Sequence, residues 1–102
     1  MSVEITDMSE LPDERSSRVR VFGSEVYPKT VRIKLSEGEE LPPHRHEGYK
    51  VVIHVVSGRL AAKIGDESYI LEEDDMATFE GGKAVSLEAE RESSLLVILC
   101  KT

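Results

Sequence analysis

The chain has no tryptophan, only one cysteine, and no apolar run near the length of a membrane span. A membrane-spanning helix needs about 20 consecutive apolar residues, so no membrane partner is expected. Aromatic residues make up 5% of the sequence, which leaves little material for the stacking platforms that bind single-stranded nucleic acids. The lone Cys100 excludes an intrachain disulfide and a structural zinc site built from several cysteines.

Positively charged residues are also fewer than negatively charged ones. The sequence has 13 Lys and Arg residues against 20 Asp and Glu residues, for a net charge of -7. Binding to a phosphate backbone requires a basic stripe, so nucleic acid is not an expected partner. The first residues lack the apolar core of a signal peptide, and a single thiol suits a reducing compartment. These features together predict a cytoplasmic protein.

What the chain does contain is typical of a small globular domain. Its 102 residues are 39% hydrophobic and 32% charged, enough for one packed core under a solvated surface. We therefore expect a single domain over residues 1–102. Residues 1–17 form a polar lead, which could lie as an arm over a partner subunit.

Short apolar or alternating runs are separated by Gly, Pro, Ser and Asp at regular intervals, and no segment keeps a helical period for three turns. This pattern predicts an all-β fold, a sandwich or small barrel in which each strand buries one face. The expected strands cover residues 18–22, 30–35, 41–46, 50–57, 59–64, 68–71, 76–79, 84–89 and 94–100.

Two of these strands differ in their pattern. Residues 30–35 alternate between apolar and charged side chains, which predicts one face in water. Residues 50–56 are apolar on both faces apart from His54, which favours a homodimer or a covering N-terminal segment. In a regular strand His54 shares a face with Val52 and Val56, whereas a β-bulge would turn it the other way.

The stretch ELPPHRHE, residues 40–47, holds two of the three histidines. His44 and His46 are two residues apart, so they share one face of a strand and point the same way. Two neutral imidazoles bind a transition metal weakly unless further ligands help. Without metal, two imidazoles would bind a small anion more strongly as the pH falls, because protonation adds charge and hydrogen-bond donors.

Residues 38–58 resemble the first conserved motif of the cupin superfamily, G-x5-H-x-H-x3-4-E-x6-G. Gly38, His44, His46 and Gly58 match, but Val51 stands at the glutamate position. The second cupin motif, G-x5-P-x-G-x2-H-x3-N, matches cleanly only at Gly82. There Glu80 replaces the proline and Val85 the histidine.

The resemblance implies a double-stranded β-helix, the cupin jelly-roll barrel of two antiparallel sheets. It also implies a pocket between the sheets, where the family's usual metal is held by three histidines and one carboxylate. Because Val51 and Val85 have no lone pair, the chain carries a degenerate version of that metal site. We expect His44, His46, Val51 and Val85 to line the pocket.

Three functions remain open from the sequence. The leading hypothesis is a small-molecule-binding protein whose partner is a small ligand and which holds no tightly bound cofactor. The alternative is a metal-dependent enzyme of the oxygenase or isomerase type. In that case His44 and His46 bind iron, manganese, zinc or nickel together with His54, water or substrate. The third is a regulatory protein that acts through its dimer surface.

Overall fold

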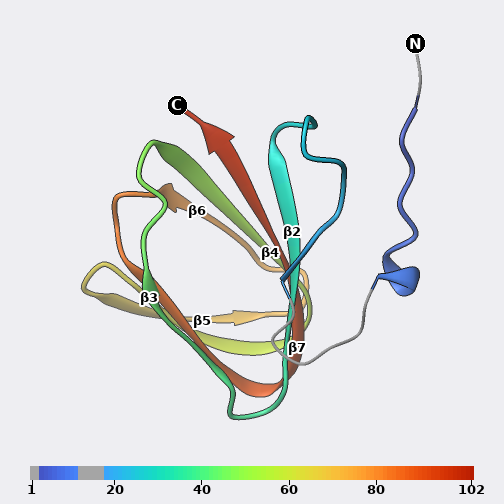
Figure 1. The fold of residues 1–102 in the computed structure, drawn as a ribbon. Coiled ribbons are helices and arrows are strands. Elements are labelled where there is room, and N and C mark those ends of the chain that lie inside the picture. The colour runs from blue at the N-terminus through green and yellow to red at the C-terminus, as the bar shows by residue number, and fades with distance from the viewer. Residues whose placement is uncertain (1–2, 12–17) are drawn as a thin grey trace.

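The structure is a computed structural model that describes residues 3–11 and 18–102. Within these residues it contains one short 3-10 helix, η1 (Met8–Glu10), and seven strands. The strands are β1 (Arg18–Arg20), β2 (Lys29–Leu35), β3 (Glu40–His44), β4 (Tyr49–Ile64), β5 (Glu67–Glu72), β6 (Met76–Glu80) and β7 (Val85–Lys101). The predicted all-β fold is confirmed (Figure 1). In the described ranges no helix is long and apolar enough to cross a membrane.

The two longest strands organise the fold. β4 and β7 pair antiparallel along almost their whole length, from Tyr49 opposite Lys101 to Ile64 opposite Val85. One half of this pair joins β1, β2 and β6 in a first layer, and the other half joins β3 and β5 in a second layer. Figure 1 follows β4 and β7 from one layer into the other. This arrangement of two antiparallel layers is the expected jelly roll.

The predicted number of strands was wrong at the bend that joins the layers. The sequence predicted nine strands, and the described residues form seven. We expected Ser57 and Gly58 to form a turn between two strands, and a second break between residues 89 and 94. Instead β4 and β7 run through both positions, with register shifts around Ser57 and Arg59. Gly58 has a φ of 97°, and a Cβ there would overlap the Ser93 side chain. A glycine therefore bends a continuous strand here instead of ending it.

The end of the barrel beside this bend is tightly packed, and we call it the closed end. Its side chains come from both layers and are fully shielded: Val55, Leu60 and Leu95 are each 0% exposed. Removal of such apolar surface from water is the main stabilising term in folding. The opposite end, which we call the open end, lies between β3, the start of β4, and both ends of β7.

The outer face of β2 is less exposed to solvent than the sequence predicted. Arg32 is only 3% exposed, and its Nη1 donates a hydrogen bond to the Met8 carbonyl at 3.5 Å. The N-terminal segment is also held by Thr6, whose hydroxyl donates to the Val21 carbonyl at 2.8 Å. Residues 3–11 thus contact their own chain next to β2, a long-range packing that strand alternation does not reveal. An arm over a partner subunit stays a prediction, and its residues 12–17 lie outside the described ranges.

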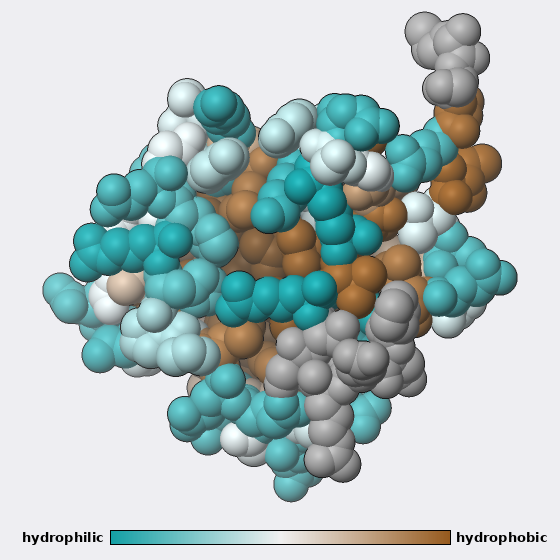
Figure 2. Space-filling view, viewed as in Figure 1, coloured by the Kyte–Doolittle hydropathy of each residue, from teal (hydrophilic) through white to brown (hydrophobic). Residues whose placement is uncertain are grey.

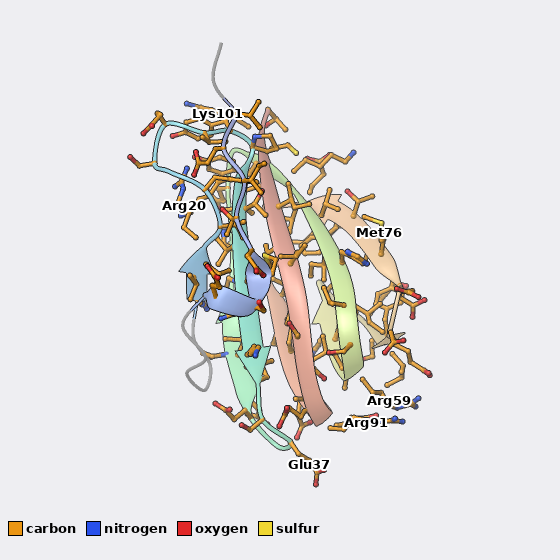
Figure 3. The ribbon with its side chains drawn as sticks, turned by 90° about the vertical axis from the view of Figure 1, so that its right-hand side faces the viewer. Arg20, Glu37, Arg59, Met76, Arg91 and Lys101 are labelled. Carbon is orange, nitrogen blue, oxygen red and sulfur yellow. The ribbon has the colours of Figure 1, made fainter. Side chains whose placement is uncertain are left out.

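The outer face of β4 carries the residues expected at a subunit contact. Pairing between residues 49 and 55 is regular, so His54 shares the outer face with Val52 and Val56 and does not line the interior. Ile98 of β7 lies beside Val52, and Met76 of β6 lies beside His54. Met76 and Val56 are exposed, and Figure 3 places Met76 at the edge of the molecule. The homodimer stays a prediction.

Candidate ligand-binding pocket

A cavity of about 260 Å³ lies between the two layers at the open end. Nine of its lining residues are aliphatic, among them Val31, Ile53, Leu87 and Leu99. They come from the inward faces of β2, β3, β4 and β7, where alternation places every second side chain in the interior. Figure 2 shows hydrophobic residues at the centre of one face, set back among hydrophilic ones.

The four residues expected to line a pocket all lie in the wall of this cavity: His44, His46, Val51 and Val85. Val85 pairs with His44 across β7 and β3, and Val51 pairs with Leu99 across β4 and β7. The two valines thus make apolar wall at the positions where the cupin motif has ligands.

The two imidazoles contact each other at the cavity wall. Their ring centroids are 4.9 Å apart, and the rings are nearly perpendicular at 89°. Nδ1 of His44 lies 3.0 Å from the Pro42 carbonyl oxygen. Because a carbonyl only accepts, Nδ1 is the protonated nitrogen in this contact and Nε2 keeps a lone pair when the ring is neutral.

His46 is positioned by a close backbone approach. Its N–H donates to the Gly81 carbonyl at 2.8 Å, and the Gly81 N–H donates to the Tyr49 carbonyl at 2.8 Å. A Cβ on Gly81 would overlap the His46 carbonyl and come within 2.6 Å of the Tyr49 carbonyl oxygen. A Cβ on Gly82, which the motif comparison selected, would have no other atom within 4 Å. The glycine that the site requires is therefore Gly81.

The environment of His46 favours its neutral form. Burial lowers the pKa of His46 below its usual value of 6.5, and the positive charges of His44, Arg18 and Lys29 lower it further. A neutral imidazole avoids both desolvation of a charge and repulsion from these neighbours.

Three cations complete the wall, and the sequence analysis gave them no role. Arg18 and Arg20 of β1 and Lys29 of β2 line the cavity. Arg18 pairs with Ile33, and Arg20 pairs with Val31, so the cations share a face with the aliphatic wall of β2. The alternation of Arg18, Val19 and Arg20 is visible in the sequence and indicates that both arginines lie on one face of β1. Only the pairing register of β1 with β2 shows that this face points into the cavity.

The residues present do not fit the metal site of the cupin motif. No group of three or more His, Cys, Asp or Glu that could hold a metal occurs in residues 3–11 and 18–102. Glu80 is exposed and forms an ion pair with Lys50 at 3.7 Å, and His54 lies on the outer face. Metal binding by His44 and His46 alone stays a prediction.

Comparison with solved structures shows the same fold in other proteins. A protein from Thermus thermophilus is 24% identical, with a TM-score of 0.82 over 97% of this chain and 98% of that one. A predicted oxalate decarboxylase from Thermotoga maritima is 17% identical, with a TM-score of 0.85 over 97% of this chain and 100% of the other. KdgF from Halomonas sp. is 18% identical, with a TM-score of 0.82 over 97% and 95% of the two chains.

A search of curated proteins finds no match to this sequence. The family model described as "Cupin domain" matches residues 31–100. That range covers all or most of six described strands, β2 to β7, and all four pocket residues expected from the sequence. The chain therefore belongs to the cupin domain family.

Proposed function

We propose that this protein is a small-molecule-binding cupin that takes its ligand into the cavity at the open end. The observation that carries the proposal is the cavity itself, an aliphatic hollow of about 260 Å³ with polar side chains gathered in its wall. Binding sites combine an apolar lining with a few placed polar groups in this way. The volume is close to the lower limit of ordinary ligand pockets, about 300 Å³, so the ligand is small.

Binding without a resident metal is the function that the side chains support best. The cavity wall in the described residues contains no carboxylate to act as an anionic ligand or as a general base. His44 and His46 supply two donors, and the motif's remaining ligand positions are valines. A ligand would therefore be held by contacts with protein side chains.

The alternative is a metal-dependent enzyme of the oxygenase or isomerase type, and one observation favours it. The paired imidazoles, with a lowered pKa that favours the neutral form of His46, present lone pairs of the kind that transition metals bind. Water and substrate would have to complete the coordination. The two hypotheses differ in whether binding survives a chelator.

The test is thermal unfolding of the protein with a panel of small organic molecules, measured with and without EDTA. A ligand present at 100 times its Kd stabilises the native state by about 2.7 kcal/mol. In a domain of this size that amounts to a rise in Tm of roughly 10–20 °C. We expect the rise to persist in EDTA.

A matched pair of variants locates the binding. Val31→Phe places a ring in the cavity wall, and Val56→Phe makes the same change on the outer face, where Val56 is 42% exposed. Val31→Phe should abolish the rise in Tm, and Val56→Phe should retain it. A rise that requires metal and vanishes in EDTA would favour the enzyme. No rise with any molecule, or an equal rise in Val31→Phe, would overturn the proposal.

A further inference from the structure

Positive charge gathers on one wall of the cavity although the chain as a whole carries a net charge of -7. Arg18, Arg20 and Lys29 line the cavity together with His44 and His46. No Asp or Glu among the described residues lines it. Ion pairs in residues 3–11 and 18–102 involve Lys50 and Arg59, not these three cations. Among the described residues, this wall therefore carries positive charges that form no ion pair, and they lie beside a hydrophobic surface.

Arg20 is the best-positioned of the three cations. Its Nη2 donates to the carbonyls of Ser24 at 3.2 Å and Val26 at 3.0 Å. The guanidinium carbon lies 5.7 Å from the centre of the Tyr27 ring, within cation–π range. The loop after β1 thus fixes the guanidinium before any ligand arrives, which lowers the entropy cost of binding.

One hydrogen-bond donor of the Arg20 guanidinium is not used by the loop. Nε of Arg20 is buried and has no hydrogen-bond partner among the described residues. A buried donor without an acceptor is destabilising, so a small shift of the guanidinium that brings Nε to a ligand acceptor would recover the lost interaction. A carboxylate oxygen suits this role because a hydrogen bond between a guanidinium N–H and a charged acceptor is stronger than one between neutral groups.

The cavity volume and its apolar wall restrict the rest of the ligand. The volume of about 260 Å³ is close to the lower limit of ordinary ligand pockets, which favours a ligand with few non-hydrogen atoms. Its remaining atoms would lie against aliphatic side chains such as Val51 and Leu99, which favours a hydrocarbon tail over a polar one.

We propose that the ligand is a small amphipathic anion, a carboxylate with a short aliphatic tail. Arg18, Arg20 and Lys29 bind its head group, and the aliphatic wall of β2, β4 and β7 binds its tail. This inference rests on the proposed function, because it names the class of molecule that the same cavity takes. It assigns binding roles to three residues outside the cupin motifs.

The test compares a charged probe with its neutral isostere. Butyrate and butyramide have similar size and shape but differ in charge, and each is titrated calorimetrically into the protein in EDTA at low ionic strength. We expect butyrate to bind at least 10-fold more tightly than butyramide. Hexanoate should bind more tightly than butyrate, because its longer tail buries more apolar surface.

Two variants of equal charge separate a specific contact from the general field of the protein. Arg20→Gln removes a cation from the cavity wall, and Arg91→Gln removes one from the far end of the molecule (Figure 3). Butyrate binding should weaken at least 10-fold in Arg20→Gln and stay within 2-fold of the parent in Arg91→Gln. Lys29→Gln, with the same expected loss, replaces Arg20→Gln if circular dichroism shows that the latter does not fold.

The outcomes distinguish this inference from the proposed function. Equal binding of butyramide and butyrate, unchanged in Arg20→Gln but lost in Val31→Phe, would overturn the anionic ligand and leave a binding pocket. Equal weakening in Arg20→Gln and Arg91→Gln would also overturn it, since only net charge would then matter. If folded parent binds no probe, or Val31→Phe binds them as well as the parent does, both proposals fail.

Discussion

The open and closed ends of the barrel are built from the same two strands, yet they differ in packing. At the closed end the inward side chains of β4 and β7 fill the interior, and Leu60 and Leu95 are 0% exposed. At the open end the inward side chains of the same strands surround a cavity of about 260 Å³, with Leu99 as part of its wall. The bend at Gly58 brings the layers together at one end and leaves room between them at the other.

The two ends also treat their charges differently. At the closed end Arg59 bonds to the carboxylates of both Glu72 at 2.5 Å and Glu90 at 2.6 Å. The hydrogen bond from Arg59 to Glu90 contributes most to raising the pKa of Arg59. At the open end Arg18, Arg20 and Lys29 line the cavity, and none of them forms an ion pair with a carboxylate of the described residues. Paired charges suit a structural end, and unpaired charges beside a cavity suit a binding end.

The largest expected difference in unfolding free energy is between alanine variants of two leucines on the same face of β7. Leu95→Ala leaves a void in the packed closed end and should lower the free energy of unfolding by about 4 kcal/mol. Leu99→Ala enlarges an existing cavity and should cost about 2 kcal/mol, because Leu99 has fewer packed neighbours to lose. Urea unfolding measures both values. Equal losses at the two sites would contradict the difference in packing.

A smaller effect is expected at two adjacent glycines of the open end. Gly81→Ala forces the backbone of His46 and Tyr49 to move, so it should destabilise the protein by about 2 kcal/mol. The cavity wall at His46 should shift as well, and butyrate should bind more weakly. Gly82→Ala meets no atom within 4 Å and should change stability by less than about 0.5 kcal/mol. The same loss in both variants would show that the close approach at Gly81 is not what holds His46.

The pH dependence of stability should reveal the positive surroundings of His46. Its pKa is lowered in the folded protein by burial and by His44, Arg18 and Lys29, so the unfolded state binds more protons below about pH 6.5. Stability is therefore full above that pH and is lost as the pH falls through about 6.5 toward the lower folded-state pKa. Glutamine cannot take up this proton.

His46→Gln isolates the effect. The difference in unfolding free energy between His46→Gln and the parent should be constant above about pH 7 and should shift in favour of the variant below about pH 6.5. Urea unfolding at pH 7.5 and pH 5.5 measures it. A difference that is the same at both pH values would mean that the open end does not disfavour a charged His46.

A substitution on the outer surface of the barrel should have the smallest effect on the packing and ligand binding of the two ends. Val52 lies on the outer face of β4, beside Ile98 of β7, at the surface where the sequence predicts a homodimer. Val52→Asp should weaken association of the chain in sedimentation velocity while butyrate affinity stays unchanged. Val52→Thr, similar in size and uncharged, is the control. Identical sedimentation of parent and Val52→Asp would count against a dimer through this face.

The fold follows from local signals, and most strands could be placed from alternation and turn residues alone. The sequence predicted a break at Ser57 and Gly58 because a Ser-Gly pair is typical of a turn. Whether such a glycine ends a strand or bends it depends on the close approach of Ser93, which is distant in the chain, so the contact is tertiary. Local patterns do not contain that information.

For the same reason, only about half of the site residues could be predicted from the sequence. The motif resemblance identified His44, His46 and the two valines, since their spacing is local. The cations on β1 and β2 required the register of β1 against β2, and Gly81 required the fold of the loop after β6 onto His46. Both depend on pairings between segments distant in the sequence, so the binding side of the cavity could not be read from the motif.

The most direct test of the central claim, that the open end works through its cations without a resident metal, is the metal content of the protein. Untagged protein purified without chelators would be analysed by inductively coupled plasma mass spectrometry, alongside the His44→Ala/His46→Ala variant. We predict far less than one equivalent of iron, manganese, zinc or nickel per chain, with no difference between the two proteins. Near-stoichiometric metal in the parent that is lost in the variant would contradict the account and establish a metal centre at the two histidines.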